Sequence, residues 1–110
     1  MITTDILTRL YDAIVVARRN GAGGYVLTTM RDIADSVRDG SAKHLVADDW
    51  PARLRRLSET KLAWAERYEQ CGIGGTSNAA ICLAEAVLYA EVGAVLEEIE
   101  RELEKAAKAA

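Results

Sequence analysis

The side chains that could act as nucleophiles or general bases in this chain are few and scattered. The single histidine is His44, and the two cysteines are Cys71 and Cys82. A serine or cysteine nucleophile needs a neighbouring base that takes up its proton. With one histidine and no nucleophile-elbow sequence, the residues predict no catalysis of this kind. We expect both thiols to be free, because their spacing does not guarantee the Cα separation of about 7 Å or less that a disulfide needs.

Acidic residues are numerous in the last third of the chain, but they do not form a metal-binding pattern. Residues 90–98 resemble part of the magnesium-binding helix of the helical nucleotide pyrophosphohydrolases, a family that uses a Glu-Glu-x-x-Glu helix. The resemblance implies a metal-dependent hydrolase. However, Ala90 and Ala94 interrupt the pattern, and Arg101 follows the Glu97–Glu98 pair where a carboxylate is needed. No Glu precedes His44 by three residues either, as it does in di-iron bundles. The sequence therefore predicts no metal, no cofactor and no enzyme.

Residues 72–77 (Gly-Ile-Gly-Gly-Thr-Ser) superficially look like a phosphate-binding loop. Amide groups at the start of a helix do attract anions. A P-loop also has a lysine and a preceding strand, and neither is predicted here. We interpret this segment as a turn between two antiparallel helices.

The acidic residues of the second predicted helix share one side. At 100° per residue, Asp32, Asp35 and Asp39 fall within about 60° of one another, opposite an apolar face. Three further residues are expected to extend this side into an acidic patch with one aromatic anchor: Asp48, Asp49 and Trp50. Such a patch suits a basic protein surface, including one that normally holds nucleic acid. An ordinary solvated helix face, with the tryptophan tucked under a helix start, would give the same pattern.

A lysine interrupts the apolar seam of the segment 50–70. The seam is expected to contain Leu54, Leu57, Trp64, Tyr68 and Cys71. Lys61 lies at the centre of this seam, where a partner helix should pack. We expect its stem to lie along the seam and its amine to pair with Glu85 or Glu91 of the following helix, in a structural role.

Apolar periodicity places the elements that carry these residues. It predicts helices over about 4–19, 28–38, 50–70 and 77–108, with one or two further turns within 41–47. A short extended piece is expected at 25–27, followed by Thr28 or Thr29 as the cap of the second helix. The first helix has an apolar stripe that consists of Leu7, Leu10, Ile14 and Ala17, widened by Ile6, Val15 and Val16.

The last helix has two halves of opposite character. Residues 79–96 are apolar on almost every side, whereas residues 97–108 are mostly charged. A helix that is apolar all round must be covered on several sides, so the first half is expected to be the spine of the domain. Its seam is expected to hold Ile81, Leu88, Val92, Val95, Ile99 and Leu103. The charged half is expected to project or to pack along a second chain, with Ile99 and Leu103 as the dimer seam. The sequence is compatible both with a homodimer and with a monomer whose own helices cover the apolar helix.

Composition favours a single small domain over residues 1–110. Half of the residues are hydrophobic, which is enough for a core. Short glycine turns between helices indicate antiparallel neighbours. The predicted fold class is therefore all-α, a small antiparallel helical bundle with a long C-terminal helix at about 77–108. Glu85 and Glu91 interrupt the longest apolar run, so we expect a soluble, cytoplasmic protein without membrane contact.

A DNA-binding regulator is the alternative function. Residues 6–58 follow the order of a winged helix-turn-helix protein, and they resemble it in having a helix, a short strand, a helix and a further short helix. The segment in the recognition position offers Lys43 and His44, but it ends in two aspartates that would repel phosphates. The net charge of −3 also argues against nucleic-acid binding through the phosphates. Direct nucleic-acid binding is therefore expected less than protein binding.

The sequence thus predicts a non-enzymatic protein-binding module, an inhibitor or adaptor that occludes a basic, nucleic-acid-handling partner. In size and acidic charge the chain resembles small phage and mobile-element anti-defence proteins, anti-CRISPR proteins among them. That resemblance implies steric or charge-mimicking occlusion of the partner. It is carried by general character and by no shared motif.

Overall fold

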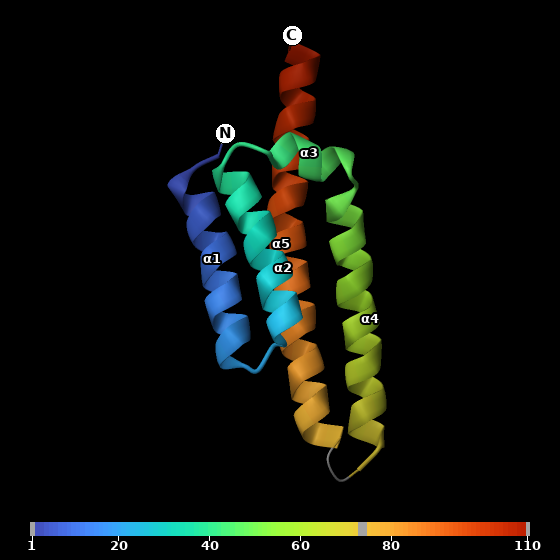
Figure 1. Cartoon of the computed structure of the whole chain (residues 1–110). Helices are drawn as coiled ribbons and strands as arrows, with labels where there is room; N and C mark the ends of the chain where they lie inside the picture. Colours follow the sequence, from blue (N-terminus) through green and yellow to red (C-terminus); the bar gives the residue numbers. More distant parts are fainter. Residues whose placement is uncertain (1, 73–74, 110) are drawn as a thin grey trace.

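The computed structural model describes residues 2–72 and 75–109 and contains helices only in this part of the chain. The helices are α1 (Thr4–Arg19), α2 (Gly24–Arg38), α3 (Ala42–Ala47), α4 (Trp50–Gln70) and α5 (Gly75–Ala109). Figure 1 shows α1, α2 and α4 arranged lengthwise along α5, with the short α3 crossing near one end. The predicted all-α bundle with a long C-terminal helix is confirmed.

Helix α5 is the spine of the bundle. It contacts each of the other four helices. Leu88, Val92, Val95, Leu96 and Ile99 on this helix are fully or almost fully buried. At 1.5 Å per residue a helix of this length is about 52 Å long, and it accounts for the longest dimension of the molecule, 57 Å against 22 and 18 Å. Its last turns extend beyond the other helices (Figure 1).

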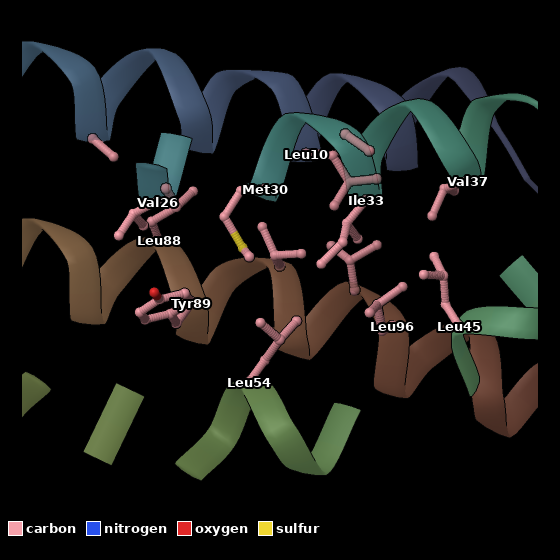
Figure 2. Packing of buried hydrophobic residues seen from close by; sticks show 14 of the residues in the cluster. Leu10, Val26, Met30, Ile33, Val37, Leu45, Leu54, Leu88, Tyr89 and Leu96 are labelled. Carbon is pink, nitrogen blue, oxygen red and sulfur yellow. The ribbon is translucent and has the colours of Figure 1, made fainter. Parts of the chain in front are cut away.

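Helix α2 contributes one apolar face to the core around α5. Met30, Ile33 and Val37 project from α2 at helical spacing and are buried. Figure 2 shows Val26 of α2 beside Leu88 of α5, and Leu54 approaching the same helix from α4. This arrangement leaves the opposite side of α2 free to face solvent.

Helix α2 begins earlier than predicted. The expected extended piece at 25–27 and the expected cap at Thr28 or Thr29 are wrong, because these residues lie inside the helix. Gly23 is the N-cap, and its backbone N–H donates to Glu85 Oε2 at 2.8 Å. Glu85 of α5 thus accepts the N–H of the N-cap residue itself, the group that a capping-box Glu within the helix would bind, and no side chain caps the first turn of α2. No residue near Gly23 in the sequence indicates that Glu85 accepts its hydrogen bond.

The contact between α4 and α5 differs from the predicted seam. Leu54, Ser58 and Ala65 are buried, whereas Leu57 and Trp64 are 37% and 45% exposed. Cys71 is exposed as well, so the predicted seam is wrong for these three residues. Small residues on the contact line bring the helices close together. Ser58 Oγ donates to the carbonyl of Ala86 at 2.9 Å. A Cβ on Gly93 would lie only 3.3 Å from Leu54 Cβ. Large side chains are therefore displaced to the flanks of the contact.

Glycines end three helices as expected. Gly21, Gly40 and Gly72 have φ values of +93°, +90° and +80°. These left-handed conformations are accessible to glycine at little steric cost and terminate α-helices. Helix α5 begins at Gly75, two residues before the predicted start. The predicted turn includes residues 73–74, which lie outside the described residues.

One described helix is long and apolar enough to cross a membrane. It is the segment Ser77–Ala109 of α5, and 61% of its most apolar window is buried inside the molecule. A core helix of a water-soluble bundle meets the same criterion when its apolar sides are covered by other helices. The burial of this window agrees with that second interpretation.

Candidate functional site: the outer face of α2

Four residues define the α2 outer face: Tyr25, Asp32, Asp35 and Asp39. Because α2 extends back to Gly24, Tyr25 lies on the same helix as Asp32 and Asp35, and Asp39 is the C-cap of that helix. Tyr25, Asp32 and Asp39 are seven residues apart, which places them almost in line along the helix. Tyr25 is 84% exposed, the most exposed of the large hydrophobic residues in the described chain. This tyrosine is not among the predicted site residues, because residues 25–27 were expected to be extended. The seven-residue spacing would have identified it.

The carboxylates of the α2 outer face are partly held by neighbours. The Tyr11 hydroxyl of α1 donates to Asp35 Oδ1. This hydrogen bond, together with burial, raises the pKa of Tyr11. Arg38 reaches Asp35 at 3.5 Å and Asp39 at 3.2 Å. Asp32 is exposed. The face has three carboxylates, and one guanidinium, that of Arg38, pairs with two of them, so the face remains acidic. Asp35 is held in place by Tyr11 and Arg38.

The remaining predicted site residues lie at the other end of α3. Asp48 and Asp49 are exposed at the start of α4, and Figure 1 shows that α3 separates them from the end of α2. Trp50 is half-buried and packs against the core. The Arg53 guanidinium lies 3.9 Å from the centre of its ring. The structure therefore gathers Asp32, Asp35 and Asp39 on one helix face but does not place the other two aspartates or Trp50 on it.

Of the three residues predicted for a buried polar seam, Glu85 is buried and Lys61 half-buried, and Glu85 connects three helices. Lys61 Nζ of α4 lies 2.8 Å from Glu85 Oε1 of α5. The other carboxylate oxygen accepts the N–H of Gly23 at the start of α2. Glu85 is 5% exposed. Its hydrogen bond to Lys61 raises the pKa of the lysine, against the opposing effect of burial. Glu91, the other expected partner, is exposed and lies elsewhere on α5.

A second surface feature lies between α1 and α5. An open apolar groove with a volume of about 670 Å³ is lined mainly by Ala13, Val16, Ala80, Leu83 and Val87. Val15 and Val16 are 46% and 49% exposed, so their predicted place in the buried stripe of α1 is wrong. Arg9 and Glu91 also line the groove. Arg9 pairs with Glu98 at 2.7 Å.

Within the described ranges, no group of three or more His, Cys, Asp or Glu side chains is arranged to hold a metal ion. Cys71 is exposed, Cys82 is buried, and both are free thiols, as expected. The strand expected for a winged helix-turn-helix protein is helical instead. Two arginines near the predicted DNA-contacting segment are engaged within the molecule. Arg53 stacks on Trp50, and Arg55 pairs with Glu97.

Comparison with known proteins found no match. No protein family, no curated protein and no solved structure is similar to this chain at a significant level. The α2 outer face and the groove must therefore be interpreted from their own geometry.

Proposed function

We propose that this protein is a non-enzymatic binding module whose α2 outer face docks onto a basic surface of a protein partner. The observation that carries the proposal is the alignment of a highly exposed tyrosine with two exposed aspartates along one line of α2. Tyrosine is one of the residues enriched at interface hot spots. The aspartates supply the charge that steers a basic partner and sets the register.

The rigidity of α2 supports this role. Its inner side is buried in the core, with Met30, Ile33 and Val37 at most 4% exposed, and Glu85 accepts the N–H of its N-cap residue Gly23. A binding face on a packed helix loses little conformational freedom when a partner docks. The Tyr11 hydroxyl similarly holds Asp35 in place before binding.

The partner class follows from the charge of the face. A protein surface that normally holds nucleic acid is rich in Lys and Arg, and an acidic face covers it by mimicking phosphates. In this proposal the protein acts in the cytoplasm as an inhibitor or adaptor. This is the mode of action implied by its similarity in size and charge to anti-defence proteins.

The test compares two variants with the same change in charge. Tyr25→Ala combined with Asp32→Lys and Asp39→Lys alters the α2 outer face, and the control Glu66→Lys with Glu104→Lys alters exposed positions on α4 and α5. Each protein is used as bait in nuclease-treated lysate of the source cells. Bound proteins are identified by mass spectrometry and competed with a DNA oligonucleotide.

We expect a stoichiometric protein partner that binds the wild type and the control but not the α2 variant. Loss of Tyr25 alone should weaken binding by about 2 kcal/mol, roughly 30-fold, if it is a hot spot. The effect of the aspartates should diminish as salt is added, whereas that of the tyrosine should persist. Equal binding by all three proteins would exclude the α2 outer face. Capture of nucleic acid instead, in lysate without nuclease, would favour the DNA-binding alternative.

A further inference from the structure

Helix α5 has an uncovered apolar stripe on the side away from α2. The stripe consists of Ala80, Leu83, Val87, Ala90 and Ala94, and all five residues are exposed. Leu83 is 40% and Val87 54% exposed. Their spacing of three, four, three and four residues is that of a coiled-coil seam. This α5 outer stripe is distinct from the predicted dimer seam, since Ile99 is buried in the core of the protomer and Leu103 packs against it.

Helix α1 widens the stripe into a two-helix surface. Ala13 and Val16 form the other wall of the groove that Leu83 and Val87 line. Arg9 pairs with Glu98, and a Cβ on Gly21 would lie 3.6 Å from Ile81 Cγ1. Helix α1 therefore packs beside the part of α5 that carries the stripe. The groove is also lined by four polar residues: Arg9, Asp12, Asn20 and Glu91.

We infer that this surface pairs with a second copy of the same chain, with α5 antiparallel to α5 of the partner. In an antiparallel pair the two types of seam position face each other across the interface. A two-fold axis between residues 88 and 89 places Leu83 opposite Ala94 and Val87 opposite Ala90, and repeats both contacts in reverse. Leu83 and Val87 then each meet an alanine, which keeps the two helices close over residues 83–94, and Ala80 lies opposite Glu97 at the edge of the contact.

The charges of α1 complement one another in this arrangement. The same two-fold axis sets α1 antiparallel to α1 of the partner copy. The first turn of α1 carries Asp5, and its last turn carries Arg18 and Arg19. Antiparallel pairing brings the acidic end of each α1 toward the basic end of the other. A parallel pair would bring like charges together at both ends.

The size of the surface agrees with a reversible dimer. The stripe is about 21 Å long, and two neighbouring helices are about 20 Å wide. Such a face buries on the order of 500 Å² per copy, or about 1,000 Å² in total, which is near the lower limit for a specific interface. The dimer should therefore dissociate on dilution.

The pairing leaves both α2 outer faces accessible. Around the α5 axis, the outer stripe is turned by about 120° from Leu88, which lies beside Val26 of α2 (Figure 2). The dimer would therefore present two copies of the α2 outer face on opposite sides. The two proposals remain independent, because a monomer retains its α2 outer face.

Sedimentation velocity over a concentration series tests the dimer. We expect the wild type to shift from monomer to dimer as concentration rises, and Val87→Asp to remain monomeric because it places charge in the seam. Val15→Asp is the matched control: it changes a valine of similar exposure that does not line the groove, and it should dimerise like the wild type. Circular dichroism checks that both variants are folded.

Cysteine cross-linking tests the antiparallel register. In a chain with Cys71→Ser and Cys82→Ala, the variants Leu83→Cys and Ala94→Cys are oxidised separately and as a mixture. We expect a disulfide-linked dimer in the mixture and little in either variant alone. Cross-linking of each variant with itself would indicate a parallel pair and overturn the proposal. A wild type that stays monomeric throughout would also overturn it and would leave the groove for a helix of a different protein.

Discussion

At the scale of single residues, Glu85 has the most consequential position. Its two oxygens hold Lys61 of α4 and the Gly23 N–H that begins α2. A negative charge at the start of a helix is also favourable for the helix dipole. Because Glu85 is almost completely buried, its charge must be satisfied by these contacts. We interpret the trio as a structural connection that keeps the binding helix in place.

The ion pair of Lys61 predicts a dependence of stability on pH. The pKa of Lys61 is raised in the folded state from its ordinary value of 10.5. Protonation therefore favours the folded state. Its contribution is fully present below pH 10.5 and is lost as the pH rises through the higher, folded-state value. Urea denaturation from pH 7 to pH 11.5 should show the wild type more stable than Lys61→Met at neutral pH, with the gap narrowing above 10.5. A gap that stays constant would contradict this role of the pair.

At the scale of elements, the close approach of α4 and α5 determines which residues are buried. Ser58, Ala65, Ala86 and Gly93 form the line of contact, and Leu57 and Trp64 lie beside it. Periodicity alone placed the large residues on the contact line, since they have the right spacing. The actual line is rotated toward small residues because these allow the backbones to come close. The same preference explains why Gly93 occupies a helix interior, where glycine is otherwise unfavourable.

The close approach predicts a strong effect of a larger residue at position 93. Gly93→Leu should destabilise the fold by about 1–3 kcal/mol, because the new side chain must displace Leu54 and the backbone near Pro51. Ala63→Leu, at an exposed position of α4, is the control and should change stability by less than about 0.5 kcal/mol. Urea denaturation of both variants measures the difference. Equal stabilities would mean that the two helices can separate at no cost.

At the scale of the whole molecule, the length of α5 sets the shape. The radius of gyration is 15.2 Å, larger than the value of about 13 Å typical of a compact domain of this length. The excess comes from the last turns of α5, where Glu104 to Ala109 are all exposed. This extension contributes little burial to the protomer.

The projecting end predicts that the last turns are dispensable for folding. Removing residues 105–110 should change the free energy of unfolding by less than about 1 kcal/mol, because only exposed side chains are lost from the part that the structure describes. Removing residues 97–110 should be far more damaging, since it deletes the fully buried Ile99. Thermal unfolding followed by circular dichroism distinguishes the two truncations. A large loss from the shorter truncation would show that the end of α5 contributes to the core.

The sequence by itself determined the helical class, the long apolar spine, the glycine helix ends and the shared side of Asp32, Asp35 and Asp39. These features follow from local periodicity and backbone preference, which a single segment contains. Only the tertiary structure decided where α2 begins, which side of α4 is buried and which side of α5 remains uncovered. Each depends on residues distant in the chain: Glu85 accepts the N–H of Gly23, Gly93 leaves room for Leu54, and α1 covers only part of α5. Pairing between distant residues depends on how the packed helices fit together, and no pattern within one segment specifies it.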